Sequence, residues 1–460
     1  MKPFLLSSCL LLFCPLVGQP LPEFVGTFKD SIGVDGTTHD TFSAYIPSGL
    51  EPNKESPVLF IFDPGGRGKS GITAFVEVAE AHNFLLICSN NAKNGPYGTN
   101  LEIADRLFKT VFATYSIDKD RIYTAGFSGG SRLAATIAVL SGAIQGVIAC
   151  GAGFAKHPLY FPKKGERFSY AGIVGNKDMN YREMQRTVSW LESMDISNEL
   201  FVFEGEHRWP PSEIIFRAFD WLQEELYRKG VEAEDELFRQ KQFENLYSRA
   251  RDFESQEQLV KAVKEIDRLI RYYPDMISTD SLQKSLRKLQ RDRRFKKEKT
   301  FLQKIASLED TLERRIRDRF NLEVSMAKSP DDFRWWDKTL TDLKETYGEH
   351  EREEYQQMAY RLQRQIFASA VETMDSYLRQ KKSGELDYLE QLLLHVAPQN
   401  PYTHYQLARK YAILNSRDKA LQHLEKVLEL GWNDKTLFKR TSEFEALKET
   451  EAFRVLLGKY

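Results

Sequence analysis

Cysteine is scarce in this sequence, with four residues among 460. Two of them, Cys9 and Cys14, fall near the start of the chain, which leaves too few for a disulfide framework. The other two, Cys88 and Cys150, lie in apolar runs, where a free thiol is usually a small core side chain. The cysteines therefore predict neither a network of disulfides nor a thiolate metal site.

An excess of either charge is also missing, because 65 basic residues balance 66 acidic ones and leave a formal net charge of -1. Such a balance gives no electrostatic reason to expect nucleic acid or an anionic membrane surface as a partner. The basic run at residues 291–299 is most simply a solvated helix face or a loop, with a polyanion site as the alternative. We therefore predict no nucleic-acid partner.

No apolar run reaches the ~20 residues that a membrane-spanning helix needs, so the sequence predicts no integral membrane segment. Residues 1–18 place Lys2 before a short apolar run that Pro15 interrupts, which is the pattern of a secretory signal peptide. We therefore expect an exported protein, periplasmic or secreted. A lipid anchor on Cys9 is less favoured, because the apolar stretch ahead of it is short; an uncleaved anchor is a further alternative.

The length exceeds what a single core supports, and 42% hydrophobic with 28% charged residues is typical of a folded protein. Residues 19–229 alternate apolar runs with amphipathic helical patterns. This alternation predicts an α/β domain with a mainly parallel sheet and helices on both faces. The expected strands lie at 40–46, 57–62, 84–89, 121–126, 145–150, 170–174 and 199–203.

Residues 230–460 differ in character, with long charged helical segments and hardly any strand pattern. Windows at about 250–274 and 401–430 match the spacing of tetratricopeptide repeats, and 365–398 does so more weakly. We therefore predict an all-α, tetratricopeptide-like domain whose concave surface would suit a protein partner. Residues 286–320 fit one or two packed helices, with a coiled-coil dimer as the alternative.

A Gly-x-Ser-x-Gly motif stands between the strand at 121–126 and a helical run at 129–141. It reads Gly126-Phe127-Ser128-Gly129-Gly130. A sharp strand-to-helix turn lifts a serine hydroxyl above the sheet, and small neighbours relieve the crowding. The motif therefore predicts that Ser128 is a nucleophile.

A nucleophilic serine needs a histidine base and an acid that orients it. Of His39, His82, His157 and His207, only the last follows a late strand. Asp178 follows the strand before it, which gives the chain order nucleophile, acid, histidine. We therefore predict a triad of Ser128, Asp178 and His207. Alternative acids are Asp195, Glu204 and Glu206.

An oxyanion formed at the serine needs two N–H donors. One is expected from Gly129 and the other from Gly65 or Gly66, in the loop after the strand at 57–62. The same loop leads into Gly68-Lys69-Ser70, which resembles the end of a phosphate-binding loop. However, Asp63 stands where that loop requires glycine, and its carboxylate would repel phosphate.

Residues 40–228 resemble secreted α/β-hydrolases of the polyhydroxybutyrate-depolymerase and feruloyl-esterase type. The likeness rests on residues 118–130, Asp-Lys-Asp-Arg-Ile-Tyr-Thr-Ala-Gly-Phe-Ser-Gly-Gly, and on His207-Arg-Trp-Pro210. It implies ester hydrolysis through an acyl-enzyme, without metal or organic cofactor. Phe127, the second glycine at 130 and the short segment between Cys150 and Tyr170 depart from the family pattern, so the substrate does not carry over.

These patterns together predict an exported serine hydrolase acting on an ester-containing small molecule or on an acyl group of a larger substrate. Short loops favour an open site, with a candidate apolar lining of Tyr97, Phe127, Phe154 and Trp209. Two alternatives remain, a serine peptidase of the same fold and a binding or scaffold protein with a vestigial hydrolase domain.

Overall fold

The computed structural model describes residues 25–51, 54–274, 276, 279–326, 332–380, 386–432 and 434–459. The chain forms two compact units, Met1–Phe301 and Leu302–Tyr460, which are described separately. The predicted signal peptide at 1–18, with Cys9 and Cys14, lies outside the described residues.

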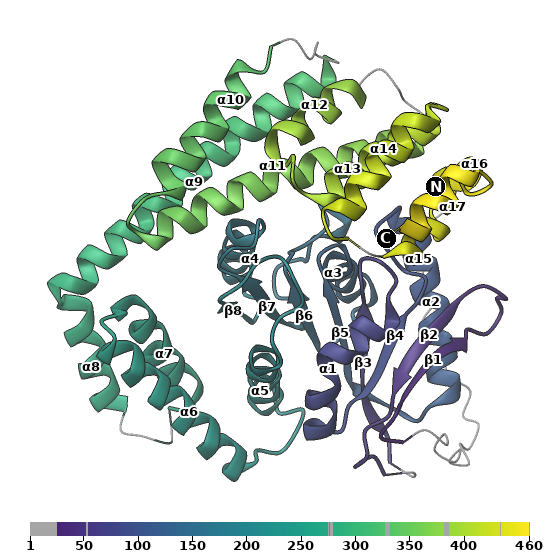
Figure 1. Cartoon of the computed structure of the whole chain (residues 1–460). Coiled ribbons are helices and arrows are strands. Elements are labelled where there is room, and N and C mark those ends of the chain that lie inside the picture. Colours follow the sequence, from purple (N-terminus) through teal and green to yellow (C-terminus); the bar gives the residue numbers. More distant parts are fainter. Residues whose placement is uncertain are drawn as a thin grey trace. The chain divides into compact units, whose positions relative to one another are not determined.

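The first unit is built on an eight-stranded sheet (Figure 1). Its strand order is β1-β2-β4-β3-β5-β6-β7-β8, the order of the α/β-hydrolase fold, and this confirms the predicted fold class. β1 and β2 pair antiparallel, as do β2 and β4, and the remaining pairs are parallel. The strands are β1 (Phe28–Gly33), β2 (Thr41–Tyr45), β3 (Ser56–Phe62), β4 (Leu85–Ser89), β5 (Ile117–Phe127), β6 (Gly146–Cys150), β7 (Ser169–Gly175) and β8 (Asn198–Phe203).

Helices cover both faces of the sheet, so the central strands are buried on both sides (Figure 1). On one face lie α1 (Gly68–His82) and α5 (Ser212–Arg228). On the other lie α2 (Tyr97–Thr114), α3 (Gly129–Ser141) and α4 (Tyr181–Ser193). Every residue of β3 is buried, which explains its unbroken apolar sequence.

Two strands differ from the sequence expectation. β1 was not expected, because Phe28–Gly33 is mostly exposed at the sheet edge and its sequence has no alternating pattern. β5 starts at Ile117, four residues before the predicted 121, through a charged stretch that is partly exposed.

The first unit continues beyond the sheet into α6 (Glu236–Ser255), α7 (Leu259–Tyr272), α8 (Thr279–Arg291) and the start of α9 (Arg293–Ser325). Ala262 and Leu269 of α7 share a hydrophobic core with Trp221 and Leu222 of α5. After α5 the chain is helical, and the compact unit extends to Phe301 because these helices pack on the sheet's own helices; the predicted boundary of 229/230 stays a prediction.

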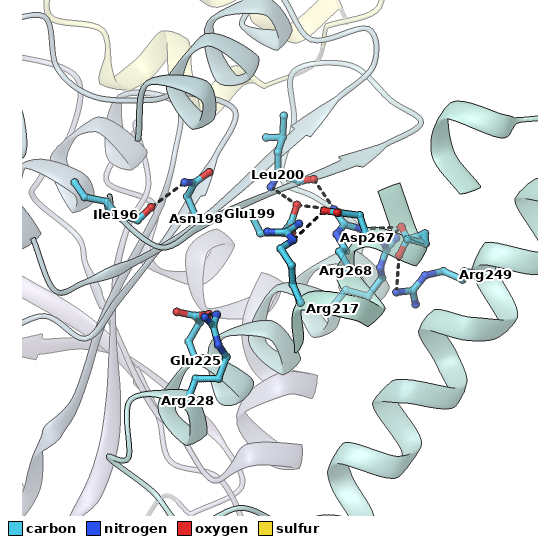
Figure 2. Close-up of polar contacts among 12 residues, drawn as sticks. Ile196, Asn198, Glu199, Leu200, Arg217, Glu225, Arg228, Arg249, Asp267 and Arg268 are labelled. Atoms are coloured by element: carbon cyan, nitrogen blue, oxygen red, sulfur yellow. Dashed lines mark hydrogen bonds and ion pairs between the residues drawn. The ribbon is translucent and has the colours of Figure 1, made fainter. Parts of the chain in front are cut away.

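A buried ionic cluster joins α7 to the edge strand β8 (Figure 2). Arg268, only 8% exposed, donates to Glu199 Oε1 at 2.7 Å and to Glu265 Oε1 at 2.7 Å. Burial alone would raise the pKa of Glu199, but the charge and hydrogen bonding of Arg268 lower it, so the pair stays ionised. The cluster thereby ties a helix to the open edge of the sheet.

The second unit is all-helical, as predicted. After α9 it contains α10 (Arg334–Thr341), a π-helical turn (Asp342–Gly348), α11 (Glu353–Arg379), α12 (Leu386–Val396), α13 (Pro401–Ile413), α14 (Arg417–Glu429), α15 (Lys435–Arg440), a 3-10 turn (Ser442–Phe444), α16 (Glu445–Lys448) and α17 (Glu451–Lys459). Ala408 and Ala420 are fully buried where α13 meets α14, beside Leu424. Small residues thus let this pair approach closely, while the likeness to tetratricopeptide repeats stays a prediction.

Both cysteines in the described part of the chain, Cys88 and Cys150, are free and buried. Burial raises the pKa of each thiol, so neither is a ready thiolate. Among the described residues, no helix combines the length and apolarity of a membrane span, and no group of acidic, histidine or cysteine side chains is arranged to hold a metal ion.

Candidate active site

Ser128 occupies a sharp turn between the end of β5 and the first residue of α3. Its backbone has φ 54° and ψ -120°, a conformation that L-residues rarely adopt. Strain of this kind persists only where the surrounding structure enforces it. Ser128 thus lies directly after the carboxyl end of β5 and directly before the N-terminus of α3.

Two glycines of the motif are required by close packing. A Cβ atom at Gly126 would lie 2.3 Å from the backbone carbonyl of Gly130, and one at Gly130 would lie 1.9 Å from the carbonyl oxygen of Phe62. Either atom would force the backbone of β3, β5 or α3 to move. The second glycine at 130 is thus a packing requirement of the turn.

Ser128, His207 and Asp178 form a continuous hydrogen-bonded chain. His207 Nε2 lies 2.9 Å from Ser128 Oγ, and His207 Nδ1 lies 2.8 Å from Asp178 Oδ2. The three residues follow β5, β8 and β7, whose parallel carboxyl ends meet at one edge of the sheet. Asp178 is 1% exposed, whereas the His207 side chain retains 21% exposure.

The Asp178 carboxylate is held on its second oxygen as well. Its Oδ1 accepts the Asn180 N–H at 2.8 Å, and the Asn180 side chain donates to Gly151 O at 2.7 Å. With Asp178 accepting from Nδ1–H, the other ring nitrogen, Nε2, is left to accept the serine proton. The carboxylate thereby selects the imidazole tautomer that a general base needs.

The other histidines and acids considered from the sequence lie elsewhere. The side chain of His82 faces Asp220 at 3.5 Å, and that of His157 accepts from Leu159 N–H. Asp195 pairs with Lys164 at 2.9 Å on the surface. Glu204 and Glu206 are exposed. Of these acids, Asp178 is the one that the structure places on His207.

The backbone amides expected to bind an oxyanion differ in whether they already donate a hydrogen bond within the protein. The Gly129 N–H belongs to the first turn of α3, where amides lack helical acceptors and the helix dipole favours negative charge. In contrast, Gly65 N–H donates to Asp63 Oδ1 at 2.8 Å, and Gly66 N–H donates to Asp63 O at 3.0 Å. In this geometry neither loop amide is available to an oxyanion, contrary to the sequence expectation.

Asp63 was considered in the sequence only as an obstacle to phosphate, yet it anchors one side of the site. The carboxylate is fully buried and accepts from Gly65 N–H, from Arg67 Nε at 2.9 Å and from Trp209 Nε1 at 3.1 Å. The hydrogen bond with Asp63 raises the pKa of Arg67. A buried strand ending in Asp-Pro-Gly-Gly-Arg was the available signal for this anchor.

The four predicted lining residues differ in position. Phe127 is buried with its ring 4.6 Å from that of His207 and 5.5 Å from that of Trp209, which is half-buried. Phe154 is 6% exposed and stacks on Tyr170 at 5.4 Å, which makes it part of the core.

Tyr97, the fourth of these residues, is half-buried and lies 5.4 Å from the ring of Tyr160. Tyr160 ends a short 3-10 helix, Pro158–Tyr160, and was not identified from the sequence. Because this helix contacts α3, Tyr97 and Tyr160 remain candidates for an aromatic wall beside the nucleophile.

No family model matches the chain, and no curated protein matches it in sequence. Among solved structures, the S-formylglutathione hydrolase FrmB of Staphylococcus aureus is 14% identical, with 44% of this chain and 98% of that one covered and a TM-score of 0.35. The feruloyl esterase module of Clostridium thermocellum is also 14% identical, covering 44% and 91%, with a TM-score of 0.34. An esterase of the archaeon Pyrobaculum calidifontis is 14% identical, covering 45% and 84%, with a TM-score of 0.35.

Proposed function

We propose that the chain is an exported serine hydrolase that cleaves carboxylic esters through an acyl-enzyme formed on Ser128. The observation that carries this proposal is the hydrogen-bonded chain from Ser128 Oγ through His207 to Asp178, at a strained strand-to-helix turn. Three side chains from three separate strand ends meet there in the order that proton transfer requires.

Acylation would begin with attack of Ser128 Oγ on the ester carbonyl carbon. The hydroxyl proton passes to His207 Nε2, which is within hydrogen-bond distance, and the carbonyl oxygen becomes an oxyanion. His207 then returns that proton to the leaving alkoxide as the C–O bond breaks. Asp178 stabilises the imidazolium that forms between the two transfers.

Deacylation would repeat these steps with water as the nucleophile. His207 takes a proton from water as the oxygen attacks the acyl carbon, and then delivers it to Ser128 Oγ as the acyl bond breaks. Both tetrahedral intermediates place negative charge beside the Gly129 N–H at the start of α3. The cycle leaves an acid and an alcohol and requires no cofactor.

The substrate is proposed to be a small ester, or an acyl group that protrudes from a larger molecule. The segment between Cys150 and Tyr170 is short and contains the 3-10 helix at Pro158–Tyr160, so it leaves little room for a lid. Export through residues 1–18, and a protein partner bound by the helical second unit, belong to the same proposal.

The experiment combines an active-site probe with paired substrates. A fluorophosphonate should label the wild type at Ser128 and leave Ser128→Ala unlabelled, while Ser141→Ala, at the other end of α3, should label normally. Hydrolysis of p-nitrophenyl esters should exceed that of matched p-nitroanilides. Faster anilide cleavage would favour a peptidase instead, and a wild type without label would indicate a vestigial hydrolase domain.

A further inference from the structure

The oxyanion of the proposed reaction has one donor near Ser128 and lacks a second among the expected residues. Gly129 N–H opens α3, but the amides of Gly65 and Gly66 are both bound to Asp63. Releasing Gly65 N–H would break a contact of the fully buried Asp63 carboxylate, and releasing Gly66 N–H would open the turn that it closes on the Asp63 backbone carbonyl. A second donor therefore has to come from another element at this edge of the sheet.

Asn94, in the loop between β4 and α2, lies against the residue that follows the nucleophile. A Cβ atom built on Gly129 would lie 1.9 Å from Asn94 Oδ1, 3.0 Å from its Cγ and 3.6 Å from its Nδ2. The carboxamide thus occupies the space that a side chain at residue 129 would fill. It is within a few ångströms of the backbone that presents the Gly129 N–H.

The backbone at Asn94 and at the preceding residue is held by hydrogen bonds, whereas none of the described residues pairs with the Asn94 side chain. Asn94 N–H donates to Pro64 O at 2.8 Å. The preceding residue, Lys93, is clamped by Asn100, whose Nδ2 donates to Lys93 O at 2.7 Å and whose Oδ1 accepts Lys93 N–H at 3.2 Å. Asn94 is exposed, and within the described part of the chain its carboxamide makes no hydrogen bond.

We propose that the carboxamide of Asn94 is the second oxyanion donor, acting with Gly129 N–H on the intermediate formed at Ser128. This inference rests on the proposed function. A half-turn about the last side-chain bond exchanges the carboxamide oxygen and nitrogen, so the –NH₂ group can face the developing charge. A neutral donor on a loop whose backbone is held by hydrogen bonds is a type of group that can stabilise such an intermediate.

The same contact accounts for the glycine at position 129. A Cβ atom at residue 129 would displace the exposed Asn94 carboxamide from this place, although the Gly-x-Ser-x-Gly pattern itself leaves that position open. The glycine thereby admits a polar side chain from another loop to the oxyanion. Gly129 and Asn94 would thus both contribute to stabilising the oxyanion.

The test compares Asn94→Ala and Asn94→Asp with Lys93→Ala, an exposed residue of the same loop that serves as the matched control. Single-turnover acylation by a p-nitrophenyl ester should slow by about 100-fold or more in Asn94→Ala, the usual effect of losing one oxyanion donor. Asn94→Asp should be at least as slow, because its carboxylate repels the oxyanion. Lys93→Ala should acylate at the wild-type rate.

A second readout separates a donor from a residue that only shapes the loop. A trifluoromethyl ketone forms an adduct with Ser128 that carries the oxyanion, so its affinity should fall in Asn94→Ala by the same factor as the acylation rate. The affinity for the product carboxylic acid should not change. Equal weakening of both ligands would overturn the proposal.

The two proposals fail in different ways. If the wild type gives no acyl-enzyme, ester hydrolysis at Ser128 is wrong. If the wild type acylates and Asn94→Ala does so within threefold of its rate, with the same thermal midpoint, the donor role of Asn94 is wrong while the function stands.

Discussion

The active-site edge of the first unit and the helical second unit bury polar side chains in different ways. In the first unit, buried Asp63 and Asp178 each face the loops at the carboxyl edge of the sheet, where they hold Trp209 and His207. In the second unit, buried charges satisfy one another within a helical layer, as Arg361 does with Glu309. Burial of a charged side chain therefore does not by itself indicate a functional site. A better indication is a buried carboxylate that contacts a partly exposed reactive group, as Asp178 contacts His207.

The two units also differ in backbone strain at the residues with positive φ that are compared below. Ser128 has a positive φ and a ψ of -120°, outside the left-handed helical region that asparagine tolerates. Asn415, between α13 and α14, also has a positive φ of 56°, but it is a residue type that adopts such turns readily. The backbone conformation that is unfavourable for its residue type thus occurs at Ser128, whose hydroxyl contacts His207. The conformation that is tolerated occurs at Asn415, in a simple turn between two helices.

The largest expected effect concerns the convergent acid. Asp178→Asn should lower kcat for ester hydrolysis by about 10⁴-fold, because an amide no longer selects the required imidazole tautomer. The thermal midpoint should change little. Glu206→Gln, an exposed acid beside His207, is the control and should retain nearly full activity. A similar loss of kcat in both variants would contradict a specific role of Asp178 in orienting His207.

A smaller effect is expected from the self-satisfied pair in the helical unit. Arg361→Met should lower the free energy of unfolding of that unit by about 3–5 kcal/mol, because Glu309 would be left buried and unpaired. The double variant Arg361→Met with Glu309→Leu should recover much of that loss. Urea unfolding measures both, and kcat/KM for esters should be unchanged in each.

A third prediction concerns the strain at the nucleophile. Ser128→Gly should raise the free energy of unfolding of the first unit by about 1 kcal/mol, since glycine adopts positive φ without cost. Asn415→Gly should leave the second unit within a few tenths of a kcal/mol of wild type. Stabilities that shift equally would remove the contrast between the two turns.

The smallest effect is a pH dependence confined to the helical unit. Burial, together with the nearby His404, lowers the pKa of His423 to about 4, while Glu390 opposes this and Lys410 and Lys419 add to it. The unfolded chain, with a histidine pKa near 6.5, binds the extra proton first. Stability conferred by neutral His423 is therefore complete above pH 6.5 and declines as the pH falls toward 4.

Urea titrations at pH 7 and pH 5 measure this decline. His423→Gln should flatten the difference between the two pH values, because the side chain no longer titrates. An unchanged slope in that variant would assign the pH dependence to other groups.

Local patterns in the sequence were sufficient to predict the seven strands from β2 to β8, apart from the early start of β5, and the turn at Ser128. Because parallel strands bring their carboxyl ends together, His207 and Asp178 could be grouped with the serine from chain order alone. β1 could not be found, since an exposed edge strand such as Phe28–Gly33 lacks the apolar pattern of buried strands.

Contacts between segments that are distant in the chain could not be predicted from the sequence. Whether the amide of Gly65 is free depends on the direction of the Asp63 side chain, and that of Gly66 depends on a turn closed by the Asp63 backbone carbonyl; no local pattern encodes either. Phe154 could equally have faced a pocket or the core, and its stacking on Tyr170 decided this. In the same way, the apolar stripe of α7 does not specify α5 as its neighbour.

The close approach of Asn94 to Gly129 also constrains how the sequence can vary. Because 1.9 Å separates the Asn94 oxygen from the place of a Cβ atom at residue 129, the two positions share a single volume. A library that enlarges residue 129 alone would push the exposed Asn94 side chain out of this volume, whereas paired libraries that shrink residue 94 at the same time would remove the clash. Among natural variants of this chain, alanine or serine at 129 should therefore coincide with a smaller residue at 94.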